Sequence, residues 1–178
     1  RELFQTHLRE CYGALFTAAA GSLRKLAQNP KYVGSRRLGF TGVLHTWGRT
    51  LSYHPHVHFL VPGGALGADG QQWLPSHPQF LVPVKTASGR FRDKLLALLA
   101  DGGLEEPLRQ QVAHKKWVVH SQAVGDGRDA LRYLAPYVYR VALSNRRLLK
   151  CEPGPDGLGR VTFTYRKKGS RRERAMTV

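Results

Sequence analysis

Acidic side chains are scarce in this sequence. Asp and Glu together number 12 against 28 Lys and Arg, which gives a formal net charge of +16. So large an excess of positive charge indicates the kind of partner that the protein binds, rather than its fold. A polyanion, with nucleic acid the first candidate and a membrane surface the alternative, is the predicted partner.

Cysteines and long apolar runs are also nearly missing. Cys11 and Cys151 are the only two cysteines, and they stand too far apart for a zinc-knuckle spacing or a disulfide framework. This usage is typical of a reducing cytoplasm. No run of about 18 apolar residues occurs and no signal-peptide pattern opens the chain, so we expect no membrane partner. None of the P-loop signature appears either.

The chain has 178 residues, enough for one domain with a sizeable core. Apolar residues recurring every three or four positions predict helices, and alternating runs bounded by Gly and Pro predict strands. The expected helices cover residues 2–28, 91–100, 104–114 and 127–141, and the expected strands cover 38–46, 56–61, 72–74, 117–124, 147–152 and 160–166. This order predicts an α+β domain with a mainly antiparallel sheet and helices packed on one face.

Three histidines fall on two neighbouring strands. His56 and His58 are two residues apart, so their side chains point to the same face of a strand. His45 lies on the preceding strand, and a hairpin that sets it opposite His56 or His58 brings all three imidazoles together. Three histidines with open coordination positions describe a catalytic metal site. The alternative is a solvated strand end, and His54, next to Pro55, is a weaker candidate ligand.

Two tyrosines, Tyr133 and Tyr137, are four residues apart on an expected helix and therefore share a helix face. Tyrosines at this spacing are usually half-buried packing residues. Pro136 lies between them and removes a helical hydrogen bond, so the helix either kinks there or ends just before it.

Cationic and aromatic side chains are interleaved along the chain. Cations follow a phosphate backbone, and aromatic faces stack on unpaired bases. The candidate DNA-binding residues are Arg36, Arg37, Trp47, Arg49, Arg132, Arg140, Arg146 and Arg147. The alternative is a solvated basic surface.

The segments around Leu44-His45-Thr46-Trp47-Gly48, His54-Pro55-His56-Val57-His58 and Tyr133-Leu134-Ala135-Pro136-Tyr137 closely resemble the two-tyrosine HUH transposases of bacterial insertion sequences, in particular the insertion sequence ninety-one family. The resemblance covers essentially all of the chain. It implies an RRM-like (ferredoxin-like) sheet that carries the histidines, with the tyrosine helix beside it. It further implies that residues 1–178 are one catalytic domain, a fragment without the N-terminal zinc module and the C-terminal end of the family.

This resemblance implies rolling-circle-type transposition. His45, His56 and His58 would bind a divalent metal ion, Mg²⁺ or Mn²⁺, and Tyr133 and Tyr137 would cut single-stranded DNA through a 5′-phosphotyrosine. The partners would be the single-stranded transposon ends and the target, and the location would be the bacterial cytoplasm, at the nucleoid. Two alternatives stay open: an HUH replication initiator or relaxase, and a non-catalytic single-strand-binding module of RRM-like shape.

Overall fold

The computed structural model describes residues 2–48, 50–103, 106–139, 142–167 and 169–178, with the backbone alone at some of them, Tyr133, Pro136, Tyr137 and Tyr139 among these. Helices and antiparallel strands alternate along the chain, which confirms the predicted α+β class. The elements are α1 (Glu2–Thr6), α2 (Leu8–Ala27), β1 (Thr41–Trp47), β2 (Tyr53–Leu60), β3 (Gly64–Leu66), β4 (Trp73–Pro75), α3 (Val84–Asp101), α4 (Glu106–Ala113), α5 (Gly127–Tyr139), the 3-10 turn η1 (Asn145–Arg147), β5 (Leu148–Pro153), β6 (Gly159–Arg166) and β7 (Glu173–Thr177).

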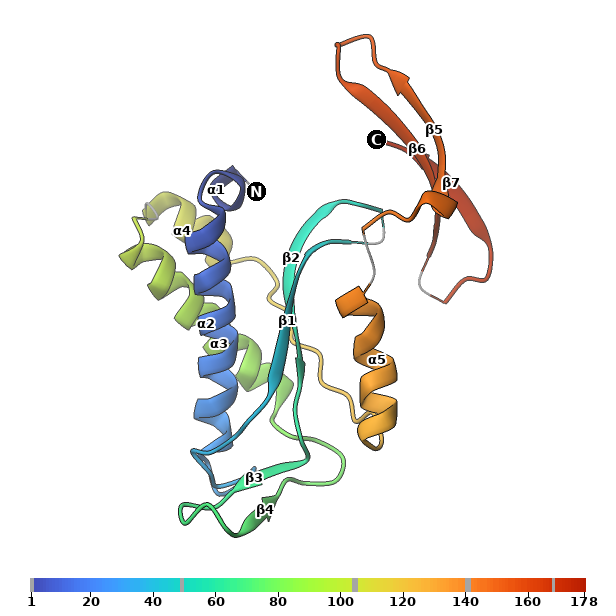
Figure 1. Cartoon of the computed structure of the whole chain (residues 1–178). Coiled ribbons are helices and arrows are strands. Elements are labelled where there is room, and N and C mark those ends of the chain that lie inside the picture. The colour runs from blue at the N-terminus through green and yellow to red at the C-terminus, as the bar shows by residue number, and fades with distance from the viewer. Residues whose placement is uncertain (1, 49, 104–105, 140–141, 168) are drawn as a thin grey trace.

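A long β-hairpin, β1 and β2, forms the centre of the molecule, and helices lie on both sides of it (Figure 1). The helices α2 and α3 pack side by side on one face, while α5 lies on the other side, against β1. This differs from the expectation of helices on one face only. A hairpin whose two faces are both partly buried can accept helices on each of them.

The described strands form three antiparallel sheets rather than the single sheet that was expected: β1 with β2, β3 with β4, and β5 with β6 and β7. Residues 117–124 have no regular secondary structure, so the prediction of a strand there is wrong. An alternating pattern makes a segment suitable for a sheet but does not provide a partner strand. β7, which the sequence did not predict, pairs with β6 through Arg166 opposite Glu173.

The main core lies between the two long helices and the hairpin. Cys11, Leu15 and Ala18 of α2 pack against Leu95 and Leu99 of α3. This spacing places the three α2 residues on one stripe of the helix. Two hairpin residues, Leu44 and Val57, pack against the same cluster and stand directly opposite each other in the strand pairing.

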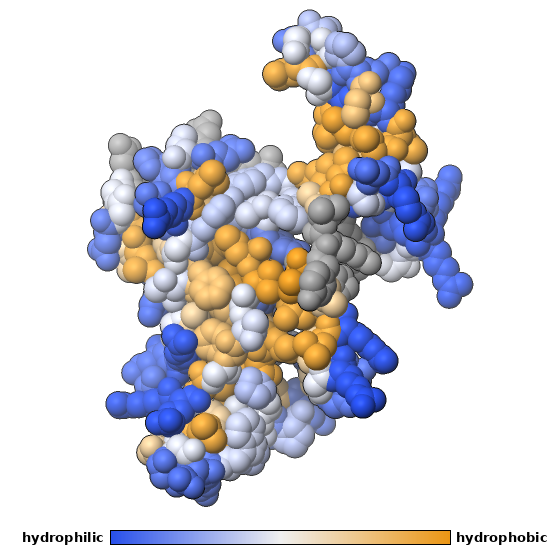
Figure 2. All heavy atoms as spheres, in the orientation of Figure 1, coloured by the Kyte–Doolittle hydropathy of each residue, from blue (hydrophilic) through white to orange (hydrophobic). Residues whose placement is uncertain are grey.

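Because side chains alternate along a strand, the residues next to Leu44 and Val57 face away from this core. Hydrophobic side chains are gathered in the middle of the molecule, between the long helices and α5, and again on the C-terminal sheet (Figure 2). Among the described residues, no helix is long and apolar enough to cross a bilayer.

Candidate metal centre

The register of the hairpin places His45 directly opposite His56, beside the pair Leu44 and Val57. His58 follows two residues after His56 on the same face of β2. The prediction that His45 faces this histidine pair is therefore confirmed. A shift by one residue would have turned His45 toward the helical core.

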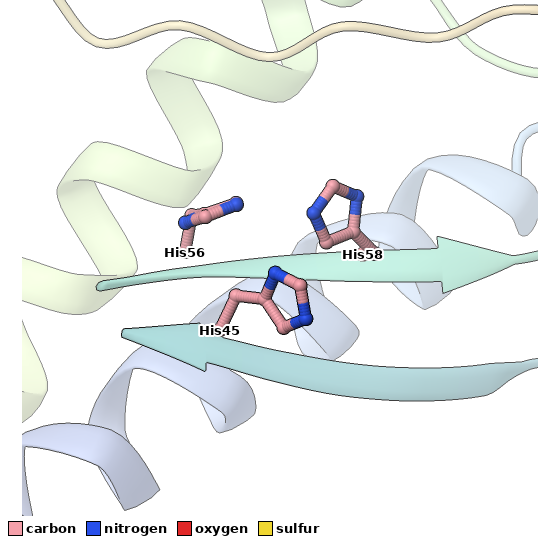
Figure 3. Close-up of side chains that lie close together, drawn as sticks. All are labelled: His45, His56 and His58. Carbon is pink, nitrogen blue, oxygen red and sulfur yellow. The ribbon is translucent and has the colours of Figure 1, made fainter. Parts of the chain in front are cut away.

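The three imidazoles converge on one point above the hairpin (Figure 3). One ring nitrogen from each of His45, His56 and His58 lies within 4.8 Å of the others. Their ring centroids are 5.5 Å apart for His45 and His56, 5.2 Å for His45 and His58, and 4.8 Å for His56 and His58. Metal–nitrogen bonds of about 2.1 Å require donor atoms about this close to one another, so the three rings fit a metal ion with small adjustments.

A backbone carbonyl orients one of these rings. Nδ1 of His56 is 2.7 Å from the carbonyl oxygen of His54. In the tautomer that donates from Nδ1, the lone pair is on Nε2 and is available to a metal ion. The contribution of His54 thus comes from its backbone, which the sequence pattern could not reveal, and its ring is not among the three that converge.

Partial burial favours the neutral form of two of these imidazoles, those of His56 and His58. Burial, followed by the unfavourable effect of a second positive charge on the neighbouring His56 or His45, lowers the pKa of His58 to about 4. The pKa of His56 is also lowered, first by burial, although its hydrogen bond to His54 opposes the shift. Only the neutral imidazole binds a metal ion.

The tryptophan that ends β1 lies beside the cluster. The indole of Trp47 stacks on the ring of His45, with centroids 5.5 Å apart and planes at 19°. This contact limits the rotation of His45. It also places an aromatic surface next to the three histidines.

The predicted tyrosine pair lies on α5. Asp126 begins this helix, as the sequence predicted, because its Oδ1 accepts hydrogen bonds from the backbone N–H groups of Arg128 and Asp129 at 2.9 and 3.1 Å. The helix continues through Pro136 to Tyr139, so it does not end before the proline. Tyr133 and Tyr137 occupy positions one turn apart on this helix, which lies against the strand that carries His45 (Figure 1); their side chains lie outside the described residues.

The predicted DNA-binding residues are spread over several elements. Arg36 and Arg37 are exposed before β1, and Arg132 of α5 is exposed and 3.7 Å from Asp129. Arg147 has a structural contact, since its Nε donates to the carbonyl oxygen of Thr164 at 2.7 Å. The others named for this role are Trp47 and Arg146, which are described, and Arg49 and Arg140, which lie outside the described residues.

Comparison with known proteins identifies the family of the chain. Residues 39–178 match the family model Y2_Tnp, described as "Putative transposase". The chain is 37% identical over 186 residues to "Putative transposase y4qJ" of Sinorhizobium fredii, covering 94% of this chain and 46% of that protein. It is 30% identical over 169 residues to "Transposase for insertion sequence element IS801" of Pseudomonas savastanoi pv. phaseolicola, covering 80% of this chain and 38% of that protein.

The chain thus spans less than half the length of these curated relatives. No solved structure matches it. The matched region contains all three converging histidines and the whole of α5. By this match the chain belongs to the Y2_Tnp transposase family.

Proposed function

We propose that this chain is the catalytic part of a DNA transposase that cuts and rejoins single-stranded DNA through a covalent phosphotyrosine, in rolling-circle-type transposition. The observation that carries the proposal is the convergence of His45, His56 and His58 on one face of the hairpin, within a chain of a transposase family. The assignment to the insertion sequence ninety-one family and the location at the bacterial nucleoid stay predictions.

The three histidines would hold a divalent metal ion. A neutral imidazole is a good metal ligand, and three protein ligands leave coordination positions open for substrate oxygens. Bound there, Mg²⁺ or Mn²⁺ would supply Lewis-acid polarisation of the scissile phosphate. The hydrogen bond from His56 to the carbonyl of His54 and the stacking of Trp47 on His45 keep two of the donor rings oriented.

Tyr133 or Tyr137 would be the nucleophile. The phenol oxygen would form a bond to phosphorus while the bond from phosphorus to the 3′ oxygen breaks. The phenol loses its proton and the departing 3′ oxygen gains one, leaving a 5′-phosphotyrosine and a free 3′-hydroxyl. The reverse attack by a 3′-hydroxyl rejoins the strand, and no triphosphate is consumed because the ester bond energy is kept.

The position of α5 supports this assignment. It packs against β1 on the side of the hairpin away from the main core, which is also the side toward which His45 points. With two tyrosines one helical turn apart, one phenol could hold one DNA end while the second phenol cuts another DNA end. Because Pro136 removes a backbone N–H between them, the two phenols need not be equivalent.

Single-stranded DNA is the proposed substrate. The net charge of +16 favours a nucleic-acid partner. Trp47, beside the histidines, offers an aromatic surface, and stacking on an unpaired base is worth about 1–3 kcal/mol. A base paired in a duplex could not reach this surface.

The test is the covalent adduct. The purified chain is incubated with Mn²⁺ and random-sequence single-stranded oligonucleotides that carry a fluorophore at the 3′ end, because the fragment that bears the 5′ phosphate stays on the protein. We expect a fluorescent protein band that resists denaturation, and no such band with a 5′ label, with a duplex or after chelation.

Four variants assign the roles. His45→Ala and the double variant Tyr133→Phe/Tyr137→Phe should form no adduct, whereas the single tyrosine variants show which phenol acts first. Arg9→Ala, at the start of α2, is the control. A double tyrosine variant that still forms the adduct would show that another residue is the nucleophile.

A further inference from the structure

A basic pocket lies at the other end of the molecule from the β1–β2 turn. It has a volume of about 860 Å³ and is lined by the end of α2, the segment that leads into β1, and α3. Four of its lining residues are cationic: Lys25, Arg36, Arg37 and Arg90. Among the described residues that line it, none is acidic.

Two packed helices and one loop bring these cations together. Lys25 is in the last turn of α2 and Arg90 is on α3, which packs along α2. Lys94 lies one turn further along α3, and its ammonium group lies over Gly21, one turn before Lys25. The basic surface therefore continues out of the pocket along the groove between the two helices.

The loop that carries the two arginines is firmly anchored. Ser35 is only 5% exposed, and its hydroxyl donates to the carbonyl oxygen of Leu66 in β3 and accepts from the backbone N–H of Arg37. Its own N–H bonds the carbonyl oxygen of Ala27 at 3.0 Å. Gly34 makes the preceding turn with φ of +78°, a value that favours glycine. Arg36 and Arg37 are thus held on a fixed backbone directly after this buried anchor.

Four cations around one concavity repel one another, and of the described acidic residues Asp69, next to the lining residue Ala68, attracts Arg37. An anion would offset this repulsion, and arginine side chains match the oxygens of a phosphate with two parallel hydrogen bonds. We propose that this pocket binds a phosphate group of the DNA backbone, at a place separate from the histidine cluster. The choice of DNA as the source of the phosphate rests on the proposed function.

The position of the pocket relative to the histidine cluster indicates what it does. Arg37 directly precedes the segment that becomes β1, and His45 lies near the far end of that strand. Figure 1 shows the end of α2 beside β3, at the opposite end of the hairpin from the β1–β2 turn. A DNA strand held at the histidines and at this pocket would be fixed at two points, so the pocket is a positioning site that does not touch the reacting atoms.

The salt dependence of DNA binding tests this pocket. Fluorescence anisotropy gives the affinity of a long single-stranded thymidine oligonucleotide between about 50 and 200 mM salt. The slope of log affinity against log salt falls by about 0.7 for each single-strand phosphate contact that is lost. We expect a shallower slope for Arg36→Ala/Arg90→Ala and also for Lys25→Ala/Arg90→Ala. The control Arg9→Ala/Lys115→Ala removes the same charge from exposed sites elsewhere and should keep the wild-type slope.

Equal slopes for the wild type and both pocket variants, each shown to be folded by its thermal unfolding, would overturn the proposal. Inorganic phosphate at constant ionic strength is the second probe. If it stabilises the wild type but not the pocket variants while the DNA slopes stay equal, the pocket binds a small anion and the DNA assignment is wrong.

Adduct formation separates this proposal from the proposed function. A wild type that binds the oligonucleotide with the expected slopes but forms no adduct would refute the proposed cleavage and leave the pocket supported.

Discussion

Gly42 of β1 lies where no side chain fits. A Cβ atom there would come within 2.5 Å of Phe16 and 2.6 Å of Phe59, two rings that pack edge to face with centroids 5.4 Å apart. Gly42→Ala should therefore lower the free energy of unfolding by about 1–3 kcal/mol, the usual cost of overpacking a core. Urea unfolding measures this. Gly39→Ala is the control, because nothing lies within 4 Å of its added methyl group. Equal effects of both substitutions would contradict the packing argument.

Tyr53 ties the start of β2 to the N-terminal helices. Its hydroxyl donates to the carbonyl oxygen of Phe4 at 3.1 Å and lies 2.9 Å from the hydroxyl of Tyr12, which donates to it. Tyr53→Phe should cost about 0.5–1.5 kcal/mol of stability at neutral pH, the net value of a typical hydrogen bond. A change below this range in urea unfolding would mean that water replaces the lost contact.

The same tyrosine should make folding sensitive to alkali. Burial is the main cause that raises the pKa of Tyr53 to about 12. Between about pH 10 and 12 the unfolded chain loses the phenol proton while the folded chain keeps it, so stability falls as the pH rises through this window. Tyr53→Phe should reduce this fall relative to the wild type, as measured by urea unfolding across the window. Parallel curves would show that other groups cause the loss.

At the scale of elements, the sequence predicted what local pattern determines. The periodic spacing of Cys11, Leu15 and Leu26 located α2, and the alternation of the histidines located β2 and the face to which they point. The start of α3 was missed, because residues 84–90 are mostly polar and carry no apolar period. β7 was missed because its charged sequence resembles a solvated tail, and only its pairing with β6 makes it a strand.

The candidate site, too, could be predicted from the sequence only where it depends on local pattern. The meeting of His45 with His56 could be predicted because it needs only the strand period and a hairpin. The carbonyl of His54 and the pocket cations Lys25 and Arg90 could not, since the first is a backbone group and the others are brought together by the packing of two helices. Contacts that depend on tertiary packing leave no local pattern in a sequence.

The helix α2 contains a glycine whose replacement should stabilise it. Gly13 lies in its interior, and a methyl group there would meet nothing within 4 Å. Gly13→Ala should raise the free energy of unfolding by about 0.5–1 kcal/mol, because alanine loses less conformational freedom in a helix. Gly21→Ala is the comparison: its methyl group would displace the ammonium of Lys94, so its gain should be smaller. A larger gain at position 21, measured by thermal unfolding, would contradict this ranking.

At the scale of the whole molecule, two features on separate parts of the surface point to one partner. The histidine cluster is on the side of the hairpin that faces away from the α2–α3 core, and the basic pocket is at the end of the α2–α3 layer. Arg37 and His45 belong to one continuous segment that enters and forms β1, so the hairpin that positions the histidines also fixes the distance between the two. A polyanion long enough to reach both would be bound more tightly than either alone could bind it.

Metal binding should stabilise the whole fold, because the three histidines are brought together only when β1 and β2 pair. A ligand that binds only the folded state adds about 2.7 kcal/mol of stability at a hundred times its dissociation constant. For a domain of this size, that corresponds to a rise in melting temperature of about 5–10 °C. Mn²⁺ should produce this rise in the wild type and not in His56→Ala. His54→Ala is the matched control: it keeps the backbone carbonyl that orients His56 and removes a ring outside the cluster, so its melting temperature should still rise. A rise of equal size in both histidine variants would show that the metal ion binds elsewhere.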